Sequence, residues 1–73
     1  MMTPYQSLAD AIILQAVKDY RTALKCLKVN PNNRDARADK NEVERFFRSA
    51  WYNTLTSVDG EMLIAKLQAE VGV

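Results

Sequence analysis

Histidine is absent from this chain of 73 residues, and cysteine, glycine and proline are scarce. Without histidine, the usual zinc-binding patterns and the commonest general base near neutral pH are missing. The single cysteine, Cys26, cannot form a disulfide within the chain, so we expect a reduced, cytoplasmic setting. We expect Cys26 to be buried as a small apolar residue, with a reactive or intermolecular thiol as the alternative. The two glycines are too few for a phosphate-cradling loop.

Long apolar runs and an excess of one charge are also missing. No apolar run exceeds Ala11–Leu14, which is far too short to cross a bilayer, and the first residues lack a secretory-signal pattern. Ten basic and nine acidic side chains give a net charge of +1. No overall field therefore draws the chain to nucleic acid or to a membrane. We expect a soluble protein without a membrane partner, whose charged contacts come from local patches.

The composition of the chain favours helices. Its two prolines indicate where the first helix begins and ends. Pro4 suits the first turn of a helix capped by Thr3, although Ser7 is an equally good start. Pro31 forces the preceding residue out of helical geometry, so this helix should end near Lys28 or Val29. A second helix should begin within residues 32–35.

Polar residues predict two later boundaries. If the second helix continued straight, the large side chains of Tyr52 and Leu55 would point away from the core. We therefore predict a kink near Arg48-Ser49. Ser49 can cap a redirected turn over residues 50–55. A third helix then begins at Thr56, Ser57 or Asp59, all competent N-caps, and ends at Gly72.

Apolar residues recur at helical spacing in the three segments and define the expected core. They are Ala9, Ile13, Ala16, Val17, Tyr20, Leu24 and Leu27, then Ala36, Val43, Phe46, Phe47 and Ala50, then Leu63, Ile64, Leu67 and Val71. Residues 1–73 should therefore form a single all-α domain, a compact three-helix bundle with a kinked second helix.

Lys18, Arg21, Lys25 and Lys28 form a basic stripe on the first helix, because their spacing confines them to an arc of roughly 80°. Leu14 lies on the same side of the helix and is a large apolar residue that the predicted core does not include. The stripe is either a solubilising flank or a nucleic-acid contact, whose binding would be weak and salt-sensitive. Leu14 is either an ordinary exposed leucine or part of a contact surface.

An aromatic block follows in the second segment. Phe46 and Phe47 are expected in the core, since a small bundle needs large side chains to bury enough area. Trp51 and Tyr52 carry polar tips and can belong either to the core or to a protein-contact patch. The candidate protein-contact residues are Leu14, Arg45, Arg48, Trp51 and Tyr52.

Acidic residues offer no convincing catalytic or metal site. Asp59 and Glu61 are explained by capping of the third helix. Asp35, Asp39 and Glu42 share one side of the second helix, but they alternate with basic residues, which indicates a solvated, salt-bridged face. We expect no catalytic residue, no cofactor, no metal and no small-molecule substrate.

Three stretches carry a resemblance: Ala11–Arg21, Glu44–Ser49 and Leu55–Ile64. Together they resemble small uncharacterised proteins encoded by phages and integrative elements of Gram-positive bacteria. Such elements carry short accessory proteins, some of which block host defences, including CRISPR nucleases, by direct binding. The resemblance implies this setting and assigns no role to any residue.

The sequence thus predicts a non-enzymatic helical protein-interaction module that binds a host protein, an element protein or a second copy of itself, with inhibition of a host defence as one such role. A small nucleic-acid-binding accessory protein that uses the basic stripe is the alternative.

Overall fold

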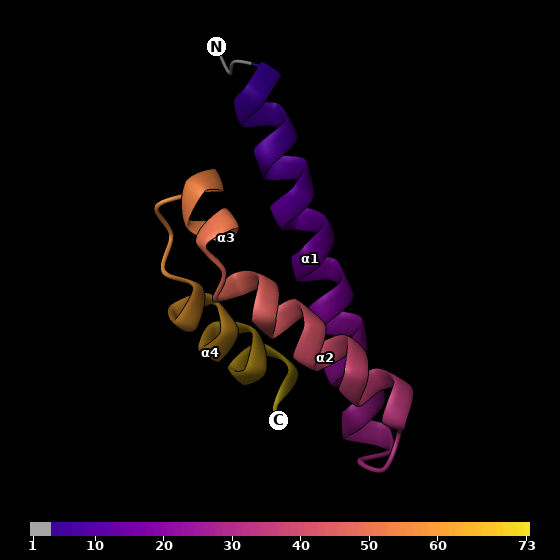
Figure 1. Ribbon diagram of the computed structural model, residues 1–73. Helices are drawn as coiled ribbons and strands as arrows, with labels where there is room; N and C mark the ends of the chain where they lie inside the picture. The colour runs from indigo at the N-terminus through magenta and orange to yellow at the C-terminus, as the bar shows by residue number, and fades with distance from the viewer. Residues whose placement is uncertain (1–3) are drawn as a thin grey trace.

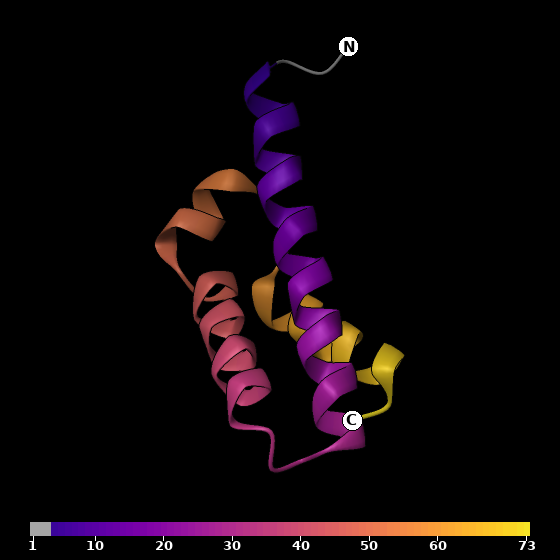
Figure 2. The same cartoon turned by 90° about the vertical axis from the view of Figure 1, so that its right-hand side faces the viewer.

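Four α-helices make up the computed structural model, which describes the backbone of residues 4–73 and the side chains of residues 7–73 (Figures 1 and 2). They are α1 (Pro4–Val29), α2 (Arg34–Phe47), α3 (Ala50–Leu55) and α4 (Gly60–Val71). No strand occurs within the described residues. The predicted all-α class is confirmed, and the three-helix bundle is corrected to four helices because the expected kink is a complete break.

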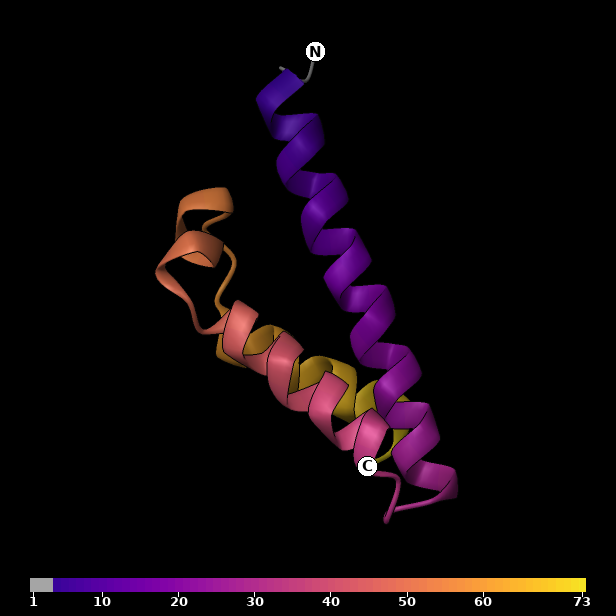
Figure 3. The same ribbon diagram turned by 45° about the vertical axis from the view of Figure 1, so that its right-hand side comes forward.

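The long helix α1 sets the shape of the molecule. Its 26 residues run along the longest dimension of the chain, which measures 42 Å. The first turns of α1 extend beyond the other helices (Figures 1 and 3). The helix begins at Pro4 and ends at Val29, as expected from Pro31. The proposed cap at Thr3 lies outside the described residues.

Ser49 separates α2 from α3. Its hydroxyl donates to the Phe46 carbonyl at 2.6 Å and accepts a hydrogen bond from the Tyr52 amide at 3.1 Å. The second bond satisfies a free N–H at the start of α3, and the first adds to the hydrogen bond that the Phe46 carbonyl already accepts from the Ser49 amide. The predicted cap and the predicted span 50–55 are confirmed.

The other helix ends follow the same chemistry. Asn33 caps α2 by accepting from the Ala36 amide at 3.1 Å, within the predicted window. Among the three candidate caps of the last helix, Asp59 is the one used, and it accepts from the Glu61 amide at 3.0 Å. Gly72 ends α4 in the left-handed conformation, with φ of 86°.

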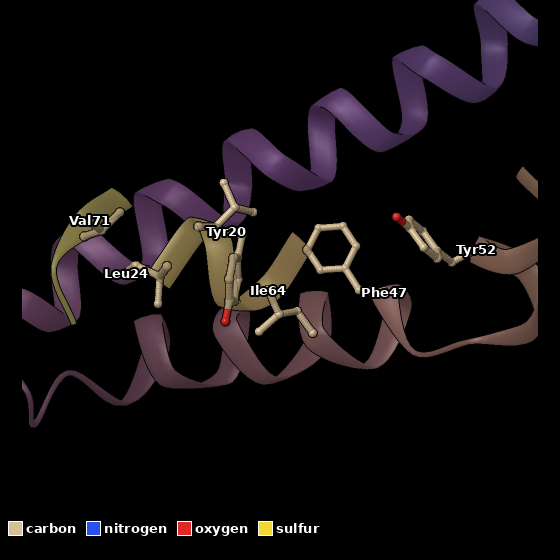
Figure 4. Close-up of a cluster of buried hydrophobic side chains, with 7 residues drawn as sticks. Tyr20, Leu24, Phe47, Tyr52, Ile64 and Val71 are labelled. Carbon is tan, nitrogen blue, oxygen red and sulfur yellow. The ribbon is translucent and has the colours of Figure 1, made fainter. Parts of the chain in front are cut away.

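The core lies where α1, α2 and α4 meet, with α3 closing one end (Figure 4). Its buried members are Tyr20, Leu24, Phe47, Tyr52, Ile64, Leu67 and Val71. All except Tyr52, whose position was left open, were expected there. Phe47 packs between two tyrosines, with ring centroids 5.8 Å from Tyr20 and 5.6 Å from Tyr52.

Two expected core residues are instead exposed. Ala50 is the first residue of α3 and lies beyond the break, so it no longer follows the buried face of α2. Cys26 lies two residues after buried Leu24, which places it on the opposite side of α1. Within residues 4–73, no helix combines the length and hydrophobicity needed to cross a membrane.

Candidate functional site

A groove runs between α1 and α2 and ends at α3. It consists of two adjacent depressions, of about 500 and 510 Å³, that share Asp19, Glu42 and Val43 in their walls. We call it the α1–α2 groove. Its apolar end is lined by Ala16, Val43, Phe46 and Trp51, and its acidic end by Asp19, Asp35, Asp39 and Glu42.

Trp51 dominates the apolar end. Its side chain is 56% exposed although its ring packs edge-on against Phe46, with centroids 5.5 Å apart. The break at Ser49 explains this position, because the redirected helix turns Tyr52 fully inward and leaves its neighbour Trp51 outside. An exposed tryptophan on a half-buried phenylalanine is an apolar surface that a partner can cover.

The acidic end owes its charge to one face of α2. Asp35, Asp39 and Glu42 are all exposed there. Among residues 7–73, none of the three forms an ion pair. Of the basic neighbours, Arg37 donates to the Pro31 carbonyl at 2.9 Å and Lys40 pairs with Glu44, whereas Arg34 is exposed beside Asp35. The three carboxylates are solvated, as expected, but the predicted salt bridges do not form among the described residues.

Metal binding gains no support from these carboxylates. No three Cys, Asp or Glu side chains in the described part of the chain are arranged to hold a metal ion. Cys26 also lines the acidic end, as an exposed thiol rather than the expected core residue.

Beneath the groove, a buried polar cluster joins three helices. The Tyr20 hydroxyl of α1 donates to Glu44 Oε2 of α2 at 2.6 Å and accepts from Gln68 Nε2 of α4 at 3.1 Å. Lys40 pairs with the same Glu44 oxygen at 2.8 Å, and Arg48 lies beside the second oxygen. The cluster links α2 to α1 and α4 through hydrogen bonds.

Ionisation of this cluster follows from its surroundings. Burial opposes the charge on Glu44, but hydrogen bonds from Lys40 and Tyr20 outweigh it and hold the pKa of the carboxyl below its usual value. Burial and the Glu44 hydrogen bond raise the pKa of Tyr20 to about 12. The burial of Glu44 could not be predicted from the sequence, since its contact with Tyr20 spans 24 positions.

The raised pKa of Tyr20 predicts a loss of stability in alkali. Between pH 10.0 and about 12 the unfolded chain releases the phenol proton while the folded protein keeps it, so rising pH favours unfolding. The loss should reach about 2 kcal/mol in the free energy of unfolding. Urea unfolding at a series of pH values measures it.

Tyr20→Phe is the control for this prediction, because phenylalanine keeps the ring and lacks the titrating proton. The variant should be less stable than wild type at pH 8, and the difference should narrow as pH rises from 10.0 to about 12. A difference that stays constant across this range would show that Tyr20 does not carry the linkage.

Two of the four cations of the basic stripe already bond to α4. Arg21 pairs with Glu70 at 3.2 Å, and the Lys28 ammonium donates to the Val71 carbonyl at 2.9 Å. Lys18 and Lys25 are exposed, and within the part of the chain whose side chains are described neither forms an ion pair. Leu14 is 66% exposed beside them.

The other candidate contact residues have different surroundings in the structure. Arg45 is exposed at the rim of the apolar end, whereas Arg48 pairs with Glu44 and Glu61. Tyr52 has no exposed surface, so its proposed role as a contact residue is corrected. The ring of Tyr52 packs against Phe46 and Phe47, and its buried hydroxyl has no hydrogen-bond partner within residues 7–73.

Comparison with protein-family models, with curated proteins and with solved structures finds no match for this chain.

Proposed function

We propose that this protein is a non-enzymatic interaction module that binds a segment of another protein chain in the α1–α2 groove. The observation that carries the proposal is the position of Trp51, exposed on Phe46 at the head of the groove. Trp51 is not part of the buried core. Tryptophan is one of the residue types enriched among the side chains that anchor protein contacts.

The shape and chemistry of the groove support an elongated polypeptide as its ligand. The two depressions follow each other along the junction of α1 and α2, with apolar walls at one end and carboxylates at the other. A helix that lays one face into such a groove could place apolar and basic side chains in turn. The resemblance to phage and mobile-element proteins adds the setting: an accessory protein that binds a host or element protein, including a defence protein.

Trp51→Ala should remove binding without unfolding the chain. Peptides selected from a display library on the wild-type protein should bind the variant at least about tenfold more weakly, since an anchoring tryptophan contributes more than 1.4 kcal/mol. Biolayer interferometry with each selected peptide measures the dissociation constants.

Met62→Ala is the matched control, because Met62 is 58% exposed on α4 and does not line the groove. Its dissociation constants should equal those of the wild type. If Trp51→Ala binds the peptides as tightly as Met62→Ala does, the groove is not the binding site.

Nucleic-acid binding by the basic stripe is the second candidate function, favoured by the exposure of Lys18 and Lys25. It has less support because Arg21 and Lys28 already bond to α4. Two remaining cations would give a weak and strongly salt-dependent affinity.

A further inference from the structure

The proposed function leaves the ligand of the groove open, and a matching surface lies on the chain itself. We infer that the α1–α2 groove binds the basic stripe of a second copy of this protein, with Leu14 of that copy seated at the apolar end. The inference rests on the proposed function and names the partner for the same groove.

The spacing of the two surfaces is the first argument. On α1, Lys18, Arg21 and Lys25 follow Leu14 by four, seven and eleven residues. On α2, Glu42, Asp39 and Asp35 precede Phe46 by the same four, seven and eleven residues. At about 1.5 Å per residue, both surfaces extend over about 16 Å.

Charge complementarity is the second argument. When α1 of one copy lies antiparallel to α2 of another, Leu14 meets Phe46 and Trp51, and the three cations meet the three carboxylates in order: Lys18 with Glu42, Arg21 with Asp39, and Lys25 with Asp35. None of the carboxylates forms an ion pair within residues 7–73. Of the cations, only Arg21 gives up a partner, and its pair with Glu70 is exposed on both sides and therefore weak.

Accessibility is the third argument. Leu14 is 66% exposed, and the first turns of α1 extend beyond the other helices, so a second molecule can approach them (Figures 1 and 3). The groove and the stripe occupy different sides of α1, since Ala16 and Asp19 line the groove while Leu14 and Lys18 belong to the stripe. One copy therefore offers its stripe to one neighbour and its groove to another.

Such a contact is heterologous, so it produces chains or rings rather than a closed two-fold dimer. The average mass should rise steadily with protein concentration, and added salt should reduce it because the pairs are exposed. Sedimentation velocity over a range of protein and salt concentrations measures both effects.

Charge reversal on each surface makes the test specific. Lys18→Glu with Lys25→Glu reverses the charge at two of the three pairing positions of the stripe, and Asp35→Lys with Glu42→Lys does the same for the groove. In each double variant alone, two of the three proposed pairs become pairs of like charge, so its self-association should weaken at least about tenfold. An equimolar mixture should associate again, because each groove then meets a stripe of opposite sign. Circular dichroism and thermal unfolding check that both variants fold.

The outcomes are distinct. Restored association in the mixture supports the inference. A wild-type protein that remains monomeric at millimolar concentration, or a folded mixture that stays monomeric, overturns it. If display-selected peptides still require Trp51 in that case, the proposed function stands with another chain as its partner. If the stripe instead binds an oligonucleotide tightly and the protein remains monomeric, the stripe serves nucleic acid and the inference fails.

Discussion

Gly60→Ala is expected to lower the free energy of unfolding by about 3 kcal/mol. A Cβ at Gly60 would lie 2.1 Å from the Phe47 carbonyl oxygen and 3.0 Å from its carbon. Both are backbone atoms at the end of α2, so neither can rotate away as a side chain would. α4 would have to move off α2, and the packing of Ile64 and Leu67 would loosen with it. Urea unfolding followed by circular dichroism measures the loss.

Gly72→Ala is the matched control, because Gly72 is required by its backbone conformation and not by a close backbone contact. Its φ of 86° is left-handed, and the nearest obstacle is the flexible Lys28 side chain at 3.1 Å. We expect a cost of about 1 kcal/mol. If Gly60→Ala costs no more than Gly72→Ala, the close contact between α2 and α4 is wrong.

Phe47→Ala is expected to cost about 3–5 kcal/mol, the range for a fully buried phenylalanine. Phe47 is 1% exposed and its ring contacts those of Tyr20, Phe46 and Tyr52. A domain of this size is expected to have only about 4–10 kcal/mol of stability, so the loss would unfold a large share of the molecules near physiological temperature. Thermal and urea unfolding report the change.

Phe47→Leu separates cavity formation from loss of the aromatic contacts. Leucine fills most of the space, so the cost should fall to about 1–2 kcal/mol. Equal losses in the two variants would mean that the site relaxes around any smaller side chain, contrary to the tight packing of the aromatic rings around Phe47.

The sequence predicted the helix boundaries well because their causes are local. Ser49, Asp59 and Gly72 act on residues within one turn of themselves, and Pro31 acts on its direct neighbour. The break at Ser49 was expected as a kink. It became a full helix end because the Ser49 hydroxyl bonds both to the Phe46 carbonyl and to the Tyr52 amide.

The site was less predictable because it depends on which helix covers which side chain. Tyr52 and Trp51 are neighbours of similar character, and only the direction of α3 decides that Tyr52 is buried and Trp51 exposed. Cys26 was placed in the core because small apolar residues usually lie there, but its side of α1 faces the groove. Burial of Glu44 needs Tyr20 from a helix far away in sequence.

The groove itself follows from two sequence features that were first interpreted separately. The carboxylates of α2 and the aromatic block are distinct patterns in the sequence, and only the packing of α2 on α1 places them in adjacent depressions. Phe46 and the three carboxylates of α2 have the same spacing as Leu14 and three cations of α1. This match gains meaning from the structure, which shows that the carboxylates, Leu14, Lys18 and Lys25 are exposed.

Fluorescence of Trp51 tests the central claim, that the α1–α2 groove is the protein-binding surface. Trp51 is the only tryptophan and lies at the head of the groove, so its emission reports directly on whether the groove is covered. When a display-selected peptide is titrated into dilute protein, the emission should shift to shorter wavelength and acrylamide quenching should fall, both saturating with the peptide. Peptides that bind while the emission and quenching of Trp51 stay unchanged would contradict the account.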